Sequence, residues 1–187
     1  MPKQVDHEQY RKELLEKSFD CFAERGYGTV TMRELAKNAG VSTGTLYHYF
    51  PSKKDIFEAL VEHLADKDLA TGATMARENR DLRSRVTALI RFLETNRDYL
   101  VKQTVIWVDY YRHQEGQLGE SSCIDRAMTK FREFVGFYLQ TEDSNLITMI
   151  VSLLNGYVLE VMGPHDHFDP DGQIELLVRI LETHGKN

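Results

Sequence analysis

The segment TGTLYHY, residues 43–49, carries hydroxyl groups, an imidazole and two phenol rings within seven positions. Only Leu46, and Phe50 four residues later, are suited to pack inward, because residues i and i+4 share one face of a helix. A core helix would bury more, whereas a helix in the major groove of DNA needs polar tips of this kind. We therefore interpret residues 43–49 as a candidate DNA-reading helix.

Each polar residue of this segment has a defined capacity for contacts with DNA. Thr43 and Thr45 offer hydroxyl groups to base edges, and their methyl groups can touch a thymine methyl. Gly44 has no side chain, so the backbone can come close to the DNA. His48 can donate or accept a hydrogen bond and is a candidate for reading a base.

Groups around the segment could hold the phosphate backbone. Tyr47 and Tyr49 can donate phenolic hydrogen bonds to phosphates while their rings pack against the domain. Lys53 and Lys54 stand at the start of the next expected helix, where positive charge and free amide groups favour a phosphate. The Thr31 hydroxyl, at the start of the preceding helix, is a further candidate.

Two short helices joined by a tight turn must position these groups. Thr31 and Glu34 form a capping box, which predicts a helix that begins after Thr31 and ends near Gly40. Ser42 can then cap the DNA-reading helix. The pair predicts a helix-turn-helix, in which the first helix crosses the phosphate backbone and the second lies in the major groove.

The next helix is also marked in the sequence. Pro51 ends the DNA-reading helix, because proline disfavours helical backbone in the residue before it. Ser52 with Asp55 repeats the capping signature and starts a longer helix. Since short helix-turn-helix patterns are often false in a single sequence, the interpretation depends on this whole linked series.

The series resembles the tetracycline-repressor (TetR) family of bacterial transcriptional regulators. The resemblance runs from about Glu16 to Leu64, about a quarter of the chain, and rests on FAERGYGTVTMRELAKNAGVSTGTLYHYFPSKKDIFEAL. Its parts are F-x-x-x-G-Y, T-x-R-x-[IL]-A-x-x-A-G-V-S, G-T-L-Y-x-Y-F and x-S-K-x-x-[IL].

The resemblance implies a DNA-binding homodimer that recognises a palindromic operator, usually as a repressor released when a small molecule binds. It implies a three-helix DNA-binding domain, a linking fourth helix, and dimerisation through the last two helices. At the matching motif positions, the implied DNA contacts are Thr31, Arg33, Thr43, Gly44, Thr45, Tyr47, His48, Tyr49 and Lys53. His48 occupies the variable position of Y-x-Y-F.

The whole chain is expected to be all-α with about nine helices. Its 187 residues include only four prolines, and runs with strand alternation are scarce. We expect a helix-turn-helix domain over residues 1–51 and an effector-binding and dimerisation domain over 52–187. Residues 1–54 carry a net charge of +2 and the remainder −8, which hints at an anion-facing N-terminal module on an acidic body.

The last two helices are expected to form the dimer interface. Residues 146–162 are apolar at twelve of seventeen positions, so that this helix must be covered on more than one face. A second chain could cover it together with residues 172–184, in a four-helix arrangement. The alternative is burial within one subunit.

The effector pocket is expected among aromatic and polar residues of the middle helices. Their aromatic content favours an apolar or aromatic effector, although each is more often a core residue than a ligand contact. The candidates are Tyr99, Trp107, Tyr110, Tyr111, His113, Phe131, Phe134, Tyr138 and Asn155.

Other function classes have little support in the sequence. The chain lacks a GxSxG elbow, a P-loop, a GxGxxG and an HExxH, so that no enzyme activity and no cofactor are expected. His165, Asp166, His167 and Asp169 are possible metal ligands, but neighbouring loop residues rarely complete a site, and none is predicted.

Two further expectations concern the cellular location of the protein and an alternative function. No stretch approaches the roughly 20 apolar residues that cross a bilayer, and the N-terminus lacks the apolar core of a signal peptide, so that a cytoplasmic protein is expected. The alternative function is a helical ligand-binding or protein-interaction module whose helix-turn-helix does not engage DNA.

Overall fold

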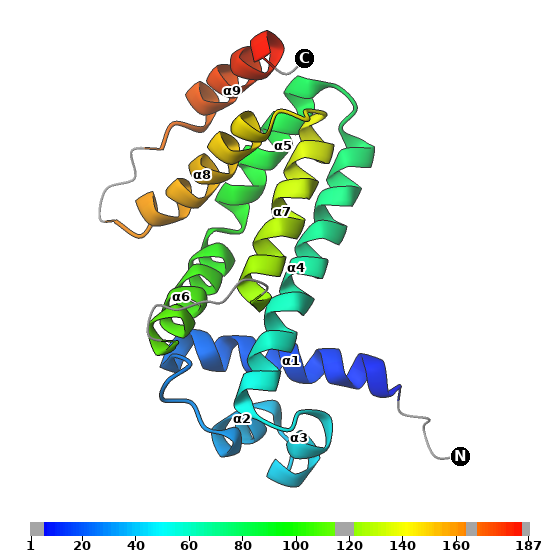
Figure 1. Ribbon diagram of the computed structural model, residues 1–187, viewed down its shortest axis with the longest axis vertical. Coiled ribbons are helices and arrows are strands. Elements are labelled where there is room, and N and C mark those ends of the chain that lie inside the picture. Colours follow the sequence, from blue (N-terminus) through cyan, green and yellow to red (C-terminus); the bar gives the residue numbers. More distant parts are fainter. Residues whose placement is uncertain (1–5, 115–121, 164–167, 185–187) are drawn as a thin grey trace. The chain divides into compact units, whose positions relative to one another are not determined.

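The computed structural model describes residues 6–114, 122–163 and 168–184. Within these ranges all regular structure is helical, as the sequence predicted (Figure 1). The nine helices are α1 (His7–Arg25), α2 (Met32–Ala39), α3 (Thr43–Tyr49), α4 (Lys53–Glu78), α5 (Leu82–Thr95), α6 (Arg97–His113), α7 (Cys123–Leu139), α8 (Ser144–Glu160) and α9 (Pro170–His184).

The N-terminal helix boundaries follow the capping residues. The Asp6 side chain accepts from the amides of Glu8 and Gln9 at the start of α1. At the end of α2, Gly40 adopts the left-handed conformation with φ 73° and ψ 29°. Glycine tolerates this conformation because it has no Cβ, and it turns the chain toward α3.

The chain packs as two compact units. The first comprises the described parts of Met1–Asp66 and Val105–Ala127, and the second those of Lys67–Thr104 and Met128–Asn187. Helices α4, α6 and α7 each contribute to both units. The domain boundary expected near residue 52 comes from the motif and stays a prediction.

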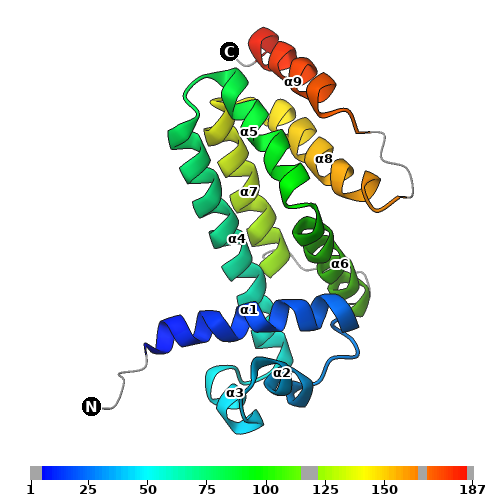
Figure 2. The same cartoon turned by 180° about the vertical axis from the view of Figure 1, so that it is seen from behind.

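The first unit contains the helix-turn-helix. In both views α1 crosses the first half of α4, and α2 and α3 lie below it (Figures 1 and 2). Its core includes Leu14, Phe22, Leu46, Phe50 and Phe57, all with at most 1% of their surface exposed. Burial of each such side chain contributes about 1.5–3 kcal/mol.

The second unit is built around α5, α7, α8 and α9. Its continuous core includes Ile90, Val135, Ile150 and Leu177. On the surface, Arg83 donates two hydrogen bonds of 2.6 and 2.8 Å to the carboxylate of Glu175, joining α5 to α9. None of the described helices is long and apolar enough to cross a membrane.

Candidate nucleic-acid interface

Helix α3 is anchored by two residues and presents the others outward. Leu46 and Phe50 are fully buried, as the sequence predicted, whereas Tyr47 is 50% exposed. Gly44 and His48 are also exposed. The other candidate contacts on this helix, Thr43, Thr45 and Tyr49, are half-buried.

The turn before α3 is fixed by local hydrogen bonds. The amide of Val41 donates to the carbonyl of Ala36 at 2.9 Å, which closes the end of α2. The Ser42 hydroxyl accepts from the Thr45 amide at 2.9 Å and caps α3. It also lies 2.8 Å from the Thr45 hydroxyl, so that this hydroxyl has an internal partner that the sequence pattern did not reveal.

No steric contact within the described residues requires glycine at position 44. A Cβ built at this position would meet only the Ser42 hydroxyl oxygen, at an ordinary contact distance of 3.7 Å. Glycine in a helix costs about 0.5–1 kcal/mol relative to alanine. No contact within the described residues thus requires glycine here, and the expected close approach of DNA to the α3 backbone stays a prediction.

The start of α2 is organised by the predicted capping box. The Thr31 amide donates to Glu34 Oε2 at 3.0 Å, and the Glu34 amide donates to the Thr31 hydroxyl at 3.3 Å. The Thr31 hydroxyl, which also donates to Glu34, holds the pKa of that carboxyl below its usual value. Arg25 pairs with Glu34 as well. Arg33, on the first turn of α2, is exposed.

The two tyrosines of α3 have different surroundings. Tyr47 projects into solvent. The Tyr49 hydroxyl lies 2.8 Å from His7 Nδ1, and the Tyr49 ring packs on Tyr10 with 5.4 Å between centroids. The expected phosphate contact of Tyr49 thus competes with a contact to α1, and a sequence separation of 42 residues hides that contact from the local pattern.

Lys53 is also partly committed to the fold. Its ammonium group donates to the carbonyl oxygens of Tyr27 at 2.6 Å and Gly28 at 3.3 Å. It lies 4.6 Å from the centroid of the Tyr27 ring. Burial lowers the pKa of this lysine, while Asp109 acts in the opposite direction. One of its three N–H donors stays unassigned, and its expected role at a phosphate stays a prediction.

Four of the expected effector residues belong to the first unit. Tyr110 stacks on Phe57 with 3.9 Å between ring centroids, and its ring also meets the edge of Tyr27 at 4.9 Å. Burial raises its pKa to about 12. His113 lies beside the Tyr27 ring, and Tyr111 is 46% exposed.

Trp107 differs from these neighbours on α6. Its indole Nε1 atom is buried, and within the described residues no acceptor lies within hydrogen-bond reach of it. A buried donor without an acceptor is unusual and costs about 1–3 kcal/mol. Among the expected effector residues, Trp107 therefore has a buried N–H donor without an acceptor in the described residues.

The remaining expected effector residues belong to the second unit. The Tyr99 hydroxyl donates to both carboxylate oxygens of Asp68, at 3.0 and 3.1 Å. Gln103 donates to the same carboxylate at 3.3 Å. Burial raises the pKa of Asp68, and the hydrogen bonds from Tyr99 and Gln103 oppose that shift. Sequence analysis missed Asp68 because nothing in the α4 pattern distinguishes it from an exposed acid.

The other members of this set do not share one environment. The rings of Phe134 and Tyr138 lie 5.5 Å apart, and Phe131 packs against the same core. The Tyr138 hydroxyl donates to the Arg85 carbonyl at 3.1 Å. Asn155 is exposed on α8. The structure thus distributes the expected pocket residues over both units and one outer surface, and the pocket stays a prediction.

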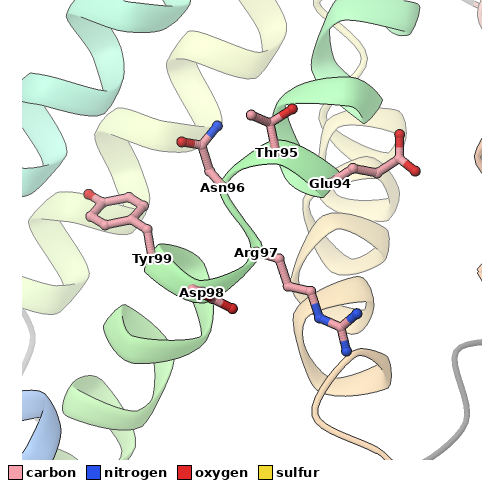
Figure 3. Close-up of a pocket in the computed structure, with 6 residues that line it drawn as sticks. All are labelled: Glu94, Thr95, Asn96, Arg97, Asp98 and Tyr99. Atoms are coloured by element: carbon pink, nitrogen blue, oxygen red, sulfur yellow. The ribbon is translucent and has the colours of Figure 1, made fainter.

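A hollow of about 430 Å³ lies where α5 meets α6. It is lined by Glu94, Thr95, Asn96, Arg97, Asp98 and Tyr99. In Figure 3 Glu94 and Arg97 point to one side of this junction, and Asn96 and Tyr99 point to the other. Because the side chains diverge and most are polar, this hollow does not have the convergent apolar lining expected for the effector pocket.

The possible metal ligands of the loop before α9 cannot be placed together. His165, Asp166 and His167 lie outside the described residues. Asp169 accepts from the Gly172 amide at 3.1 Å, a contact typical of a helix start. Elsewhere in the described ranges no group of three or more histidine, cysteine or acidic side chains is arranged to hold a metal ion.

The family comparison covers the region that contains these candidate contacts. Residues 14–60 match the model described as bacterial regulatory proteins, tetR family. The chain is 29% identical over 130 residues to the HTH-type transcriptional regulator PksA of Bacillus subtilis, covering 65% of this chain and 60% of PksA. It is 41% identical over 69 residues to the HTH-type transcriptional repressor AcnR of Corynebacterium diphtheriae, covering 37% of this chain and 34% of AcnR. These matches span less than two thirds of either relative.

Solved structures share the fold over nearly the whole chain. A transcriptional regulator from Saccharomonospora viridis in complex with choline aligns with a TM-score of 0.70 and 18% identity, covering 95% of this chain and 98% of that one. The regulator FadR of Bacillus subtilis in complex with stearoyl-CoA aligns with a TM-score of 0.69 and 17% identity, covering 94% and 98%. At these identities the likeness establishes the all-helical fold. Over residues 14–60, the helix-turn-helix region of the chain is similar to the tetR family of bacterial regulatory proteins.

Proposed function

We propose that this protein is a DNA-binding transcriptional regulator, acting as a repressor on a palindromic operator. The observation that carries the proposal is the division of α3: Leu46 and Phe50 hold the helix, and the polar side chains face outward. A packing helix has no use for an exposed imidazole and an internally unneeded glycine, which weighs against the alternative of an interaction module. Because operator DNA of a bacterial regulator is in the cytoplasm, we place the protein there.

The regulator would act as a homodimer through α8 and α9. The outer face of α8 carries Met149 and Leu159, which are 42% and 61% exposed, and α9 carries Leu176 at 44%. Gly156 lies on the same exposed part of α8, and a Cβ built there would meet nothing within 4 Å. Exposed apolar side chains next to an open glycine favour close packing against a second helix.

The effector would be a small organic molecule that the helices outside the helix-turn-helix bind. Support comes from Trp107, whose buried indole N–H could donate to an effector oxygen. The two ligand-bound structural neighbours hold choline and stearoyl-CoA. The aromatic residues of α6 and α7 favour an effector with an apolar or aromatic body.

Release from DNA would follow a population shift between two states. The C-terminal part of α6 packs, through Tyr110, on Phe57 of α4 and on Tyr27 in the segment between α1 and α2. The Gly28 amide also donates to Asp109 at 3.4 Å. An effector that favours a different position of α6 would disturb these contacts. It needs a difference in affinity between the two states, and not merely tight binding.

Selection from a library of random DNA duplexes tests the proposal. Purified protein should enrich an inverted repeat whose half-site centres lie about one helical turn, roughly 34 Å, apart. Recovery of duplexes without any shared sequence would contradict operator recognition. Enrichment of a single, unrepeated site would contradict the symmetric dimer.

A further inference from the structure

The N-terminal half of α1 carries polar side chains on the same face as its buried residues. His7 and Arg11 precede Leu14, Ser18 and Phe22 at intervals of three or four positions, which places all five on one side of the helix. The last three are buried, whereas His7 and Arg11 are exposed. His7 and Arg11 therefore extend the inner face of α1 beyond the core, and we call these two residues the polar edge.

This polar edge meets the carboxyl-terminal end of α3. His7 contacts the Tyr49 hydroxyl, as described above. The Arg11 guanidinium lies over the Phe50 ring, with 4.7 Å between its Cζ atom and the ring centroid. Phe50 is itself fully buried, so that Arg11 covers its ring from the solvent side. Both contacts fix the edge beside the helix proposed to read DNA.

Arg11 keeps its hydrogen-bonding capacity unused in this position. Across the described residues, Arg11 forms no ion pair or hydrogen bond, and its ring contact with Phe50 is its one recorded interaction. The nearby acid Glu13 accepts from Gln9 at 3.4 Å, and it lies on the opposite side of α1 from Arg11. A cation–π contact of this kind uses none of the five N–H donors of a guanidinium, so that these donors stay available for binding.

We propose that Arg11 binds a phosphate of the DNA backbone, so that the edge of α1 extends the DNA-binding surface beyond the helix-turn-helix. The inference rests on the proposed DNA-binding function. A planar guanidinium can donate two parallel hydrogen bonds to one phosphate, and the Phe50 ring behind it restricts its movement before DNA arrives. Phosphate contacts fix the register of a protein on the duplex without reading its sequence.

Two substitutions separate this role from simple packing on Phe50. Arg11→Met keeps an apolar side chain beside the ring and removes the charge, whereas Arg11→Lys keeps the charge and gives up the planar guanidinium. Arg77→Met, at an exposed position on the second-unit part of α4, is the matched control. The probe is a fluorescein-labelled 30-base-pair duplex recovered by the parent protein from the random library.

Anisotropy titrations between 50 and 200 mM KCl provide the measurement. Each lost phosphate contact lowers the slope of log K against log salt by about 0.9, so that two copies of Arg11→Met should lower it by about 1.8. Over this fourfold change in salt, the affinity advantage of the parent over Arg11→Met should shrink about 12-fold. Arg11→Lys should keep most of the parent slope, and Arg77→Met all of it.

The outcomes are distinguishable. If Arg11→Met keeps the parent slope, the phosphate role is wrong, whatever its affinity. If Arg11→Met and Arg11→Lys lose the slope equally, the stack and not the charge matters, and the proposal is wrong as well. If the parent enriches no duplex, the proposed function itself fails and Arg11 is not at issue.

Discussion

Gly44→Ala should stabilise the protein and at the same time weaken its binding to DNA. A methyl group at this position meets only the Ser42 hydroxyl oxygen at 3.7 Å, so that it causes no internal clash. Replacing glycine by alanine in a helix contributes about 0.5–1 kcal/mol to the free energy of unfolding. For a domain of this size, that corresponds to an increase in Tm of about 1–4 °C.

The same methyl group would be in the way of DNA if the α3 backbone lies close to it. Forcing an extra methyl into a close-packed contact costs about 1–3 kcal/mol. A dimer carries two copies, so that affinity for the selected duplex should fall by at least about 25-fold. Anisotropy titration measures the affinity, and thermal unfolding followed by circular dichroism measures the Tm.

Thr129→Ala is the matched control for Gly44→Ala. Thr129 is exposed on α7, so that its replacement offers a similar gain in helix propensity far along the chain from α3. We expect Thr129→Ala to raise the Tm and leave DNA binding unchanged. Parent-like affinity in Gly44→Ala would refute the argument that this glycine serves an approach to DNA. A lower Tm in Gly44→Ala would show that the fold itself requires glycine.

Three further predictions concern the fold and the assembly. Lys53→Met should lower the free energy of unfolding by about 1–2 kcal/mol, because the carbonyls of Tyr27 and Gly28 lose a charged donor; urea unfolding measures this, and an unchanged value would argue against these bonds. Burial raises the folded-state pKa of Asp68, so that the free energy of unfolding of the parent falls as the pH rises through that value. Asp68→Asn cannot ionise, and its free energy of unfolding relative to the parent should therefore increase between pH 4 and pH 7. If the two proteins differ in unfolding free energy by the same amount at pH 4 and pH 7, the raised pKa of Asp68 is wrong. Leu159→Glu, at an exposed position of α8, should weaken dimerisation by about 100-fold or more while the monomer stays folded, because the interface would bury an unpaired charge; sedimentation equilibrium tests this, and an unaffected dimer would exclude α8 from the interface.

The helices and turns of the N-terminal region could be predicted because their signals are local. The capping box joins Thr31 and Glu34 over three positions, and Gly40 ends α2 in a conformation that favours glycine. Leu46 and Phe50 were recognisable as anchors from their spacing of four. In each case the energetic reason lies within one or two helical turns of sequence.

The partners of the polar side chains could not be predicted in the same way. Tyr49 and Lys53 had the right type and position for phosphate contacts, yet His7 binds the first, and the Tyr27 and Gly28 carbonyls bind the second. Such contacts depend on how helices pack, and nothing in the local pattern records them. Tyr110 shows the same limit, because its aromatic character suited a ligand pocket but its ring packs on Phe57.

The central claim is that the outer face of α3 reads the sequence of the operator. The most direct test repeats the duplex selection with His48→Ala and compares the enriched sequence with that of the parent. We expect His48→Ala to relax the preference at a base position in each half-site. On the sequence selected by the parent, this variant should lose about 1–3 kcal/mol of binding free energy for each such base pair. Tyr47→Ala, as the phosphate-contact control, should bind all duplexes more weakly and enrich the parent sequence. An enriched sequence that His48→Ala leaves unchanged, or that Tyr47→Ala alters instead, would contradict the claim.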